Sequence, residues 1–152
     1  MLSDKVLDVS CDYCCVFGIS KPCTGVDPGS VHSSFRTKRS LLVAGGPGGR
    51  VYWFYFFKLS KTTYGSGIPE FTKSDEAKFL KEHENDIIMS QLTFGDLIKA
   101  RISSTMTALQ EHVYKQWHFD RIVTIGDAVH KVVVRSLLRV MSLTFVVINT
   151  FL

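Results

Sequence analysis

The feature that most constrains the fold is a pair of apolar runs, residues 41–44 and 51–59, joined by GGPGG. Glycines permit positive φ angles and Pro47 fixes its own φ, so the joining segment predicts a tight turn. The spacing does not match a phosphate-binding loop, because an aromatic strand follows instead of GK[ST] or a helix. The pattern therefore predicts a β-hairpin.

The second strand of this hairpin, VYWFYFF, is apolar on both faces. Alternation places Val51, Trp53, Tyr55 and Phe57 on one face and Tyr52, Phe54 and Phe56 on the other. A strand of this kind is expected to be covered on both sides. One cover is protein core, and the other is either protein or an apolar ligand.

Further elements predict an α+β or mixed α/β fold. CVFGIS reads as a strand, and residues 72–86 read as a helix capped by Thr72 or Ser74. Thr93 and Asp96 match a T-x-x-D cap for a second helix, which is expected to run toward Lys99 or Ile102. Residues 107–117 are interpreted as a continuation of that helical region.

An apolar strand at residues 122–125 ends in Gly126 and Asp127. In α/β sheets, ligands bind outside the carboxyl ends of the strands. A glycine there lets a ligand approach the backbone, and a carboxylate accepts hydrogen bonds from hydroxyl groups. The spacing alone leaves a ligand-binding or a purely structural role open.

Composition excludes several classes of protein. A net charge of +4 over 152 residues, with one local cluster of Arg36, Lys38 and Arg39, does not indicate a nucleic-acid-binding surface. Cys11 and Cys14 form a CxxC without a second pair, so reduced cysteines in a strand are expected and no metal site. No signal peptide is visible, which predicts an intracellular protein.

Several of these segments, in this order, resemble the fungal FAD-dependent monooxygenases of the para-hydroxybenzoate-hydroxylase-like class. The similarity is strongest to the paxilline-type epoxidases of indole-diterpene and meroterpenoid pathways. It covers about residues 14–131 and rests on CVFGIS, LLVAGGPGGRVYWFYFFKL, IPEFTKSDEA and LTFGDLIKARISSTMTALQEHVYKQWHFDRIVTIGDAVHK.

The resemblance implies an epoxidase or hydroxylase of terpenoid, meroterpenoid or indole-diterpene intermediates. Such an enzyme uses FAD, NAD(P)H, O₂ and an apolar small-molecule substrate. It assigns cofactor binding to Gly126 and Asp127, with the aspartate holding the ribityl chain, and leaves catalytic side chains unknown. Tyr52, Tyr55 and Tyr64 are candidate substrate-facing donors, and each is also read as a packed aromatic. His130 and Lys131 are expected to have structural roles.

The resemblance also divides the chain. Residues 1–118 are expected to be a partial substrate-binding domain of mixed sheet, and residues 119–131 the Gly-Asp strand of an incomplete, Rossmann-like FAD-binding domain. The GxGxxG that opens the family is absent from the sequence, and residues 132–152 replace a Pro- and Gly-containing loop. We therefore expect a fragment with an apolar, atypical tail, of the kind produced by intron read-through or a frameshift.

Two alternatives to an active monooxygenase stay open. One is a non-catalytic remnant of such an enzyme. The other is a small membrane-associated interaction protein, with membrane contact made through residues 132–152. That tail is interpreted either as an interfacial helix whose Arg135 and Arg139 reach toward water, or as a poorly packed end.

Overall fold

The computed structural model describes residues 9–126 and 129–131. The chain divides into two compact units. One is formed by Cys14–Lys58 and Glu70–Ala108, here called the helix-backed unit. The other draws on Met1–Tyr13, Leu59–Pro69 and Leu109–Leu152 and is here called the hairpin unit. The expected tail at 132–152 lies outside the described residues.

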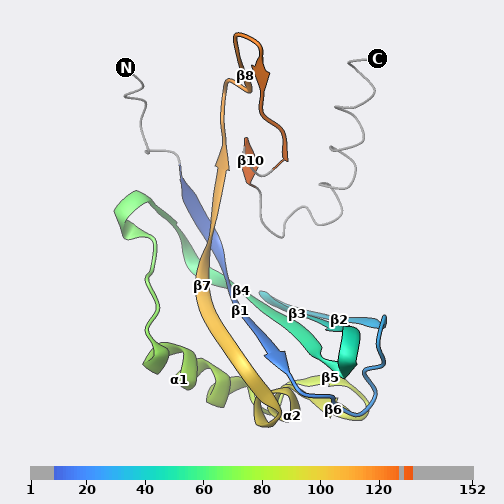
Figure 1. Ribbon diagram of the computed structural model, residues 1–152. Helices are drawn as coiled ribbons and strands as arrows, with labels where there is room; N and C mark the ends of the chain where they lie inside the picture. The colour runs from blue at the N-terminus through green and yellow to red at the C-terminus, as the bar shows by residue number, and fades with distance from the viewer. Residues whose placement is uncertain (1–8, 127–128, 132–152) are drawn as a thin grey trace. The chain divides into compact units, whose positions relative to one another are not determined.

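The main element is a six-stranded sheet in the order β10-β7-β1-β4-β3-β2 (Figure 1). β3 pairs antiparallel with both β2 and β4, and β10 pairs antiparallel with β7. The strands are β1 (Ser10–Ser20), β2 (Val31–Arg36), β3 (Arg39–Gly45), β4 (Val51–Tyr64), β7 (Arg101–Val113) and β10 (His130–Lys131).

The GGPGG hairpin is confirmed. β3 and β4 pair from Gly45↔Val51 to Arg39↔Phe57, and a short 3-10 helix, Pro47–Gly49, forms the turn between them. Gly48 and Gly49 have φ angles of 66° and 72°, which only glycine adopts without strain.

Both predicted helix starts are confirmed as well. α1 (Lys73–His83) begins with a capping box between Thr72 and Asp75, and α2 (Phe94–Lys99) begins with the same arrangement between Thr93 and Asp96. In each, the hydroxyl accepts from a backbone N–H while the carboxylate accepts from the cap's own N–H. A two-stranded hairpin of β5 (Ile87–Met89) and β6 (Leu92–Thr93) connects the helices.

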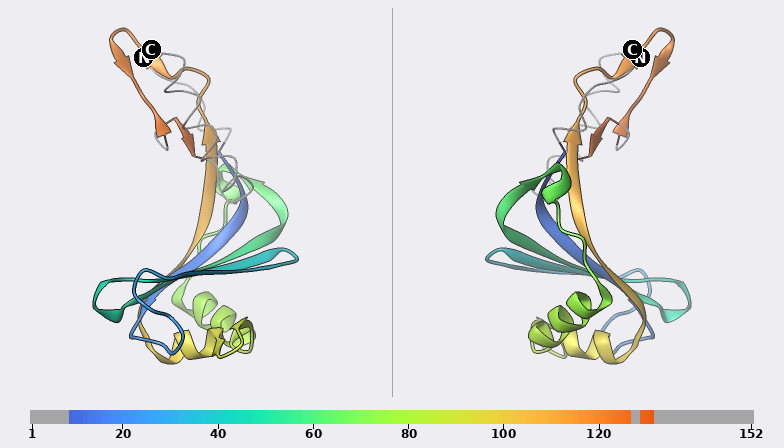
Figure 2. Two further views of the ribbon diagram at one scale, coloured as in Figure 1. Left: turned by 90° about the vertical axis from the view of Figure 1, so that its right-hand side faces the viewer. Right: turned by 90° about the vertical axis from the view of Figure 1, so that its left-hand side faces the viewer.

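The two helices lie against one side of the helix-backed unit's sheet (Figure 2). Trp53 and Tyr55 of β4 are fully buried, and both pack against Phe94 of α2, with ring centroids 5.2 and 4.9 Å apart. Phe79 of α1 lies edge-on to Tyr55 at 5.1 Å. The buried face of the aromatic strand therefore forms the core.

The expected helix at 107–117 is wrong, because Arg101–Val113 is the long strand β7. The β-branched residues Ile102, Thr105 and Thr107 suit a pleated strand, and sheet pairing outweighs helix propensity here.

The expected apolar strand at 122–125 forms only in part, and its residues are not buried among the described residues. Ile122–Val123 forms β9, paired with β8 (His118–Phe119) in a small hairpin. Ile122, Val123 and Ile125 are each more than 60% exposed. No described strand covers them.

Candidate functional site

Gly126 follows β9 in the hairpin unit and is the described half of the predicted cofactor pair. It has a φ of 64°, is exposed, and has no heavy atom of the described residues within 4 Å of the position a Cβ would occupy. Its carbonyl accepts a 3.0 Å hydrogen bond from the Val129 N–H. A ligand can therefore approach this backbone closely. Asp127 lies outside the described residues.

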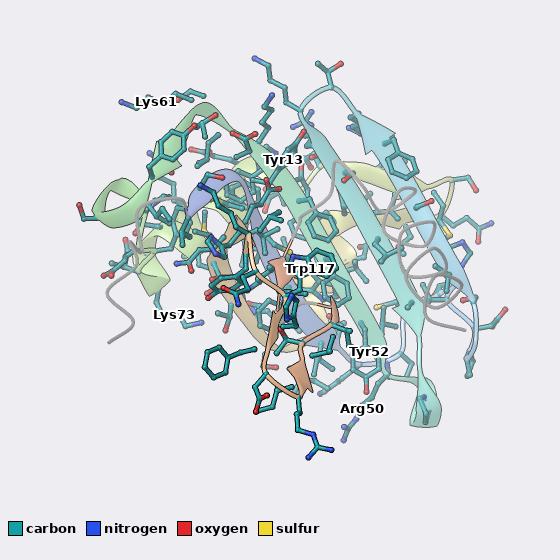
Figure 3. All side chains as sticks on the ribbon, turned by 90° about the horizontal axis from the view of Figure 1, so that it is seen from above. Tyr13, Arg50, Tyr52, Lys61, Lys73 and Trp117 are labelled. Atoms are coloured by element: carbon teal, nitrogen blue, oxygen red, sulfur yellow. The ribbon has the colours of Figure 1, made fainter. Side chains whose placement is uncertain are left out.

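The second candidate surface is the face of the helix-backed unit's sheet opposite the helices, here called the open face. Phe54 of β4 stacks between Phe17 of β1 at 6.5 Å and Phe56 at 6.2 Å. Phe17 is 43% exposed and Phe54 is 37% exposed. Tyr52, half-buried on the same face, stands near the start of β4, next to Arg50 (Figure 3). The strand is thus covered by protein on one face and presents an apolar surface on the other.

Tyr55 is not on this open face. It is fully buried beneath it, where its hydroxyl donates a 2.5 Å hydrogen bond to Asp86 Oδ2. Burial, and then the Asp86 carboxylate, raise the pKa of Tyr55, so the phenol stays a neutral donor. Of the three candidate tyrosines, Tyr55 is therefore a packed core residue, whereas Tyr64 is 61% exposed at the end of β4 in the hairpin unit.

Asp86 is the centre of a charged cluster that sequence reasoning missed. Arg36 Nη1 lies 3.0 Å from Asp86 Oδ1, and Arg39 Nη1 lies 3.5 Å from Oδ2. His83 Nδ1 lies 3.3 Å from the same oxygen. Burial is the main cause of a lowered pKa of His83, and the nearby Arg39 adds to it. The cluster fixes the β2–β3 hairpin to the end of α1, and the arginine-rich stretch RTKR was its only sequence signal.

A second buried connection positions α2 against the sheet. The Trp53 Nε1–H donates to Ser20 Oγ at 2.9 Å, and that hydroxyl donates to the Leu97 carbonyl at 2.8 Å. Ser20 is fully buried. Both donors are satisfied, so this polar chain is stable inside the core. Gly18 faces the same indole, which would lie 2.2 Å from a Cβ at that position.

The remaining candidate residues lie in strands of the six-stranded sheet. His130 and Lys131 form β10, paired opposite Val113 and His112 of β7. Cys11, Cys14 and Cys15 are buried in β1, and burial raises the pKa of the Cys15 thiol to about 12. Within the described ranges, no group of His, Cys, Asp or Glu is arranged to hold a metal ion.

No helix among residues 9–126 and 129–131 is long and apolar enough to cross a membrane.

Comparison with solved structures shows what the fold resembles. The chain superposes on tetracycline destructase Tet(51) with a TM-score of 0.53 at 11% identity, covering 86% of this chain and 35% of that one. The shared feature is the fold. No family model matches the sequence.

Sequence comparison is more specific. The chain is 33% identical over 123 residues to the FAD-dependent monooxygenase BOA8 of Botryotinia fuckeliana, which covers 81% of this chain and 16% of the relative. It is 38% identical over 120 residues to the FAD-dependent monooxygenase spyC of Aspergillus fumigatus, covering 79% and 25%. The chain is therefore related to a segment of the fungal FAD-dependent monooxygenases, and it spans between 16% and 27% of the length of the curated relatives that it matches.

Proposed function

We propose that this chain is the substrate-sheet part of a FAD-dependent monooxygenase of fungal secondary metabolism that acts on an apolar small molecule. The observation that carries the proposal is the 33–39% identity to such monooxygenases over 78–86% of the chain. Residues 1–118 contribute the substrate-binding portion and residues 119–131 the Gly-Asp part of the flavin domain. An epoxidation or hydroxylation of a terpenoid-derived intermediate is the finer form of the proposal.

Gly126 and Asp127 are the residues that would hold FAD. The exposed, left-handed Gly126 with open space above its Cα fits a closely approaching ligand. Asp127 would accept hydrogen bonds from the ribityl hydroxyls, as charged acceptors bind hydroxyls strongly. Bound FAD would supply the electron transfer from NAD(P)H and the activation of O₂.

The composition of the open face favours an apolar substrate. A stack of phenyl rings, with the half-buried Tyr52 beside it, offers dispersion contacts and few hydrogen bonds to a flat hydrocarbon skeleton. Phe54 is central in that stack. Its exposure leaves apolar area that a substrate would remove from water.

The test is a chimera in which residues 14–131 replace the matching segment of the Aspergillus fumigatus monooxygenase spyC. The purified chimera is expected to bind FAD and to consume NAD(P)H faster when the relative's substrate is present. Phe54→Asp is expected to keep the flavin and lose the substrate response, while Ile87→Asp, at an exposed apolar site on β5 away from the open face, is the control. A soluble chimera without flavin would contradict the proposal, and flavin without turnover would favour a non-catalytic remnant.

A further inference from the structure

β2 is the last strand in the order of the sheet, and its outer edge pairs with no other strand among the described residues. Val31 is 66% exposed and Phe35 is 80% exposed on this strand. Edge strands in monomeric proteins commonly carry lysine, proline or a bulge that prevents pairing with a second chain. VHSSFR contains no lysine and no proline, and its pairing with β3 is regular throughout.

The hydrogen bonds of the sheet show which backbone groups face outward. The Gly45 N–H donates to the Ser30 carbonyl, and the Gly46 N–H donates to the Arg50 carbonyl. Hydrogen-bonded and non-hydrogen-bonded pairs alternate along an antiparallel ladder. Both bonds therefore mean that every second pair, counted from Ser30↔Gly45, is hydrogen-bonded between β2 and β3. These pairs are His32↔Val43, Ser34↔Leu41 and Arg36↔Arg39.

It follows that the N–H and C=O groups of Val31, Ser33 and Phe35 point away from β3. These three residues are also the exposed ones whose side chains lie on the open face, in register with Ala44, Leu42 and Ser40. The same three residues therefore carry both the outward backbone groups and the open-face side chains, two of which, Val31 and Phe35, are apolar, in a strand of the right length to pair with a copy of itself.

We propose that two copies of this chain associate through β2 to form one continuous sheet, with Ser33 of each copy on the two-fold axis. In that register Val31 lies opposite the partner subunit's Phe35, and Ser33 lies opposite the partner subunit's Ser33. All the outward groups of the three residues are then hydrogen-bonded. The apolar pairs lie on the open face of both copies, where cross-strand aromatic and β-branched pairs stabilise a sheet.

The number of paired backbone groups favours this register over its neighbour. A two-fold axis through Ser34 would place His32 opposite the partner subunit's Arg36, and it would leave the Val31 backbone groups beyond the strand pairing. With the axis at Ser33, His32 lies opposite the partner subunit's Ser34. The Arg36 guanidinium is held by Asp86 and by the Ile87 carbonyl at 2.7 Å, so it is not drawn across the edge. The proposal does not depend on flavin chemistry.

Disulfide trapping tests the axis directly. In the full chain carrying Cys23→Ser, Ser33→Cys places two thiols on hydrogen-bonded opposite residues, whose Cα atoms are about 5.5 Å apart and within disulfide range. Ser103→Cys, at an exposed site on β7, is the matched control. We expect Ser33→Cys to form disulfide-linked dimers under mild oxidation at least about tenfold faster than the control, because pairing raises the local thiol concentration. Equal rates, or no dimer at all, would overturn the proposal.

The oligomeric state gives an independent measurement. Light scattering of the wild-type chain is expected to show a concentration-dependent dimer. Ser33→Lys brings two lysines together on the axis and should raise the dissociation constant about fivefold or more. Its thermal unfolding in dilute solution should stay as in the wild type, since the Ser33 side chain is exposed. A wild-type chain that stays monomeric would refute the β2 pairing, even if its edge binds a strand of another protein. A dimer that Ser33→Lys does not weaken would refute it as well.

Discussion

The hydroxyl of Tyr55 donates a 2.5 Å hydrogen bond to Asp86 Oδ2, across 31 residues of chain. Tyr55 lies in the middle of β4, and Asp86 follows the end of α1. Because the same carboxylate binds Arg36 of β2 at 3.0 Å, one acidic side chain connects the strands β4 and β2 to the end of α1. The strands that carry the open face are therefore linked to the helices through one carboxylate.

Asp86→Ala is expected to destabilise the helix-backed unit by about 2–4 kcal/mol, because it leaves the buried Tyr55 hydroxyl without its acceptor and removes the partner of two arginines. The arginines are about one-third exposed, which limits their share of this loss. Tyr55→Phe removes only the hydroxyl and should cost about 1–2 kcal/mol. Urea unfolding followed by tryptophan fluorescence measures both. Glu70→Ala, at an exposed carboxylate, is the control, and an Asp86→Ala loss as small as that control would contradict the cluster's role.

The lowered pKa of His83 predicts an acid-sensitive stability. The ordinary pKa is 6.5, and burial disfavours the charged form in the folded state. As pH falls below about 6.5, the unfolded chain binds a proton that the folded chain does not, so the free energy of unfolding decreases. Above that pH both states are neutral and the term disappears. His83→Gln should therefore flatten the change in urea midpoint between pH 7 and pH 5. An unchanged pH profile in this variant would show that another group causes the dependence.

Gly18→Ala is expected to destabilise the helix-backed unit by about 1–3 kcal/mol through overpacking. The new methyl carbon would lie 2.2 Å from the fully buried Trp53 ring, which is held by its hydrogen bond to Ser20. Near-ultraviolet circular dichroism should show a changed tryptophan signal together with the lower urea midpoint. Gly67→Ala, where a Cβ would meet nothing within 4 Å, is the matched control. Equal stability of the two variants would mean that the indole moves without cost.

Expressed by itself, the 152-residue chain is expected to purify without bound FAD. The curated relatives extend well beyond the matched segment, and no GxGxxG occurs in this sequence to bind a pyrophosphate at a helix N-terminus. The measurement is the flavin absorbance at about 450 nm of the purified protein. A yellow preparation with one flavin per chain would contradict the prediction.

Local signals explain what the sequence predicted correctly. The capping boxes at Thr72 and Thr93 and the GGPGG turn depend on residues a few positions apart, so their geometry is set by the chain itself. The sequence predicts helix where β7 forms, because the strand state of β7 depends on the sheet that it joins. The exposed Ile122 shows the same limit, because an apolar run predicts burial but does not identify the residues that would bury it.

The candidate site was predicted only in part for the same reason. Alternation correctly separated the two faces of β4, and Phe54 lies on the predicted second face. The same alternation applied to CVFGIS would have placed Phe17 opposite the buried Val16, and so on the open face. Asp86 had no such signal, because its partners come from four separate elements, β2, β3, β4 and α1, that meet only in the folded unit.

The last prediction concerns Asp127 in the spyC chimera. If residues 122–125 gain a cover from the relative's flavin domain, Gly126 would face the cofactor and Asp127 would bind the ribityl hydroxyls. Asp127→Ala should then weaken FAD binding by about one to two orders of magnitude, because a hydrogen bond to a charged group contributes about 1.5–3 kcal/mol. Asp127→Asn keeps an acceptor oxygen and should lose less. Tyr55→Phe, beneath the open face, should leave flavin affinity unchanged. Flavin fluorescence quenching measures all three, and equal affinity in the wild type and Asp127→Ala would remove this residue from the site.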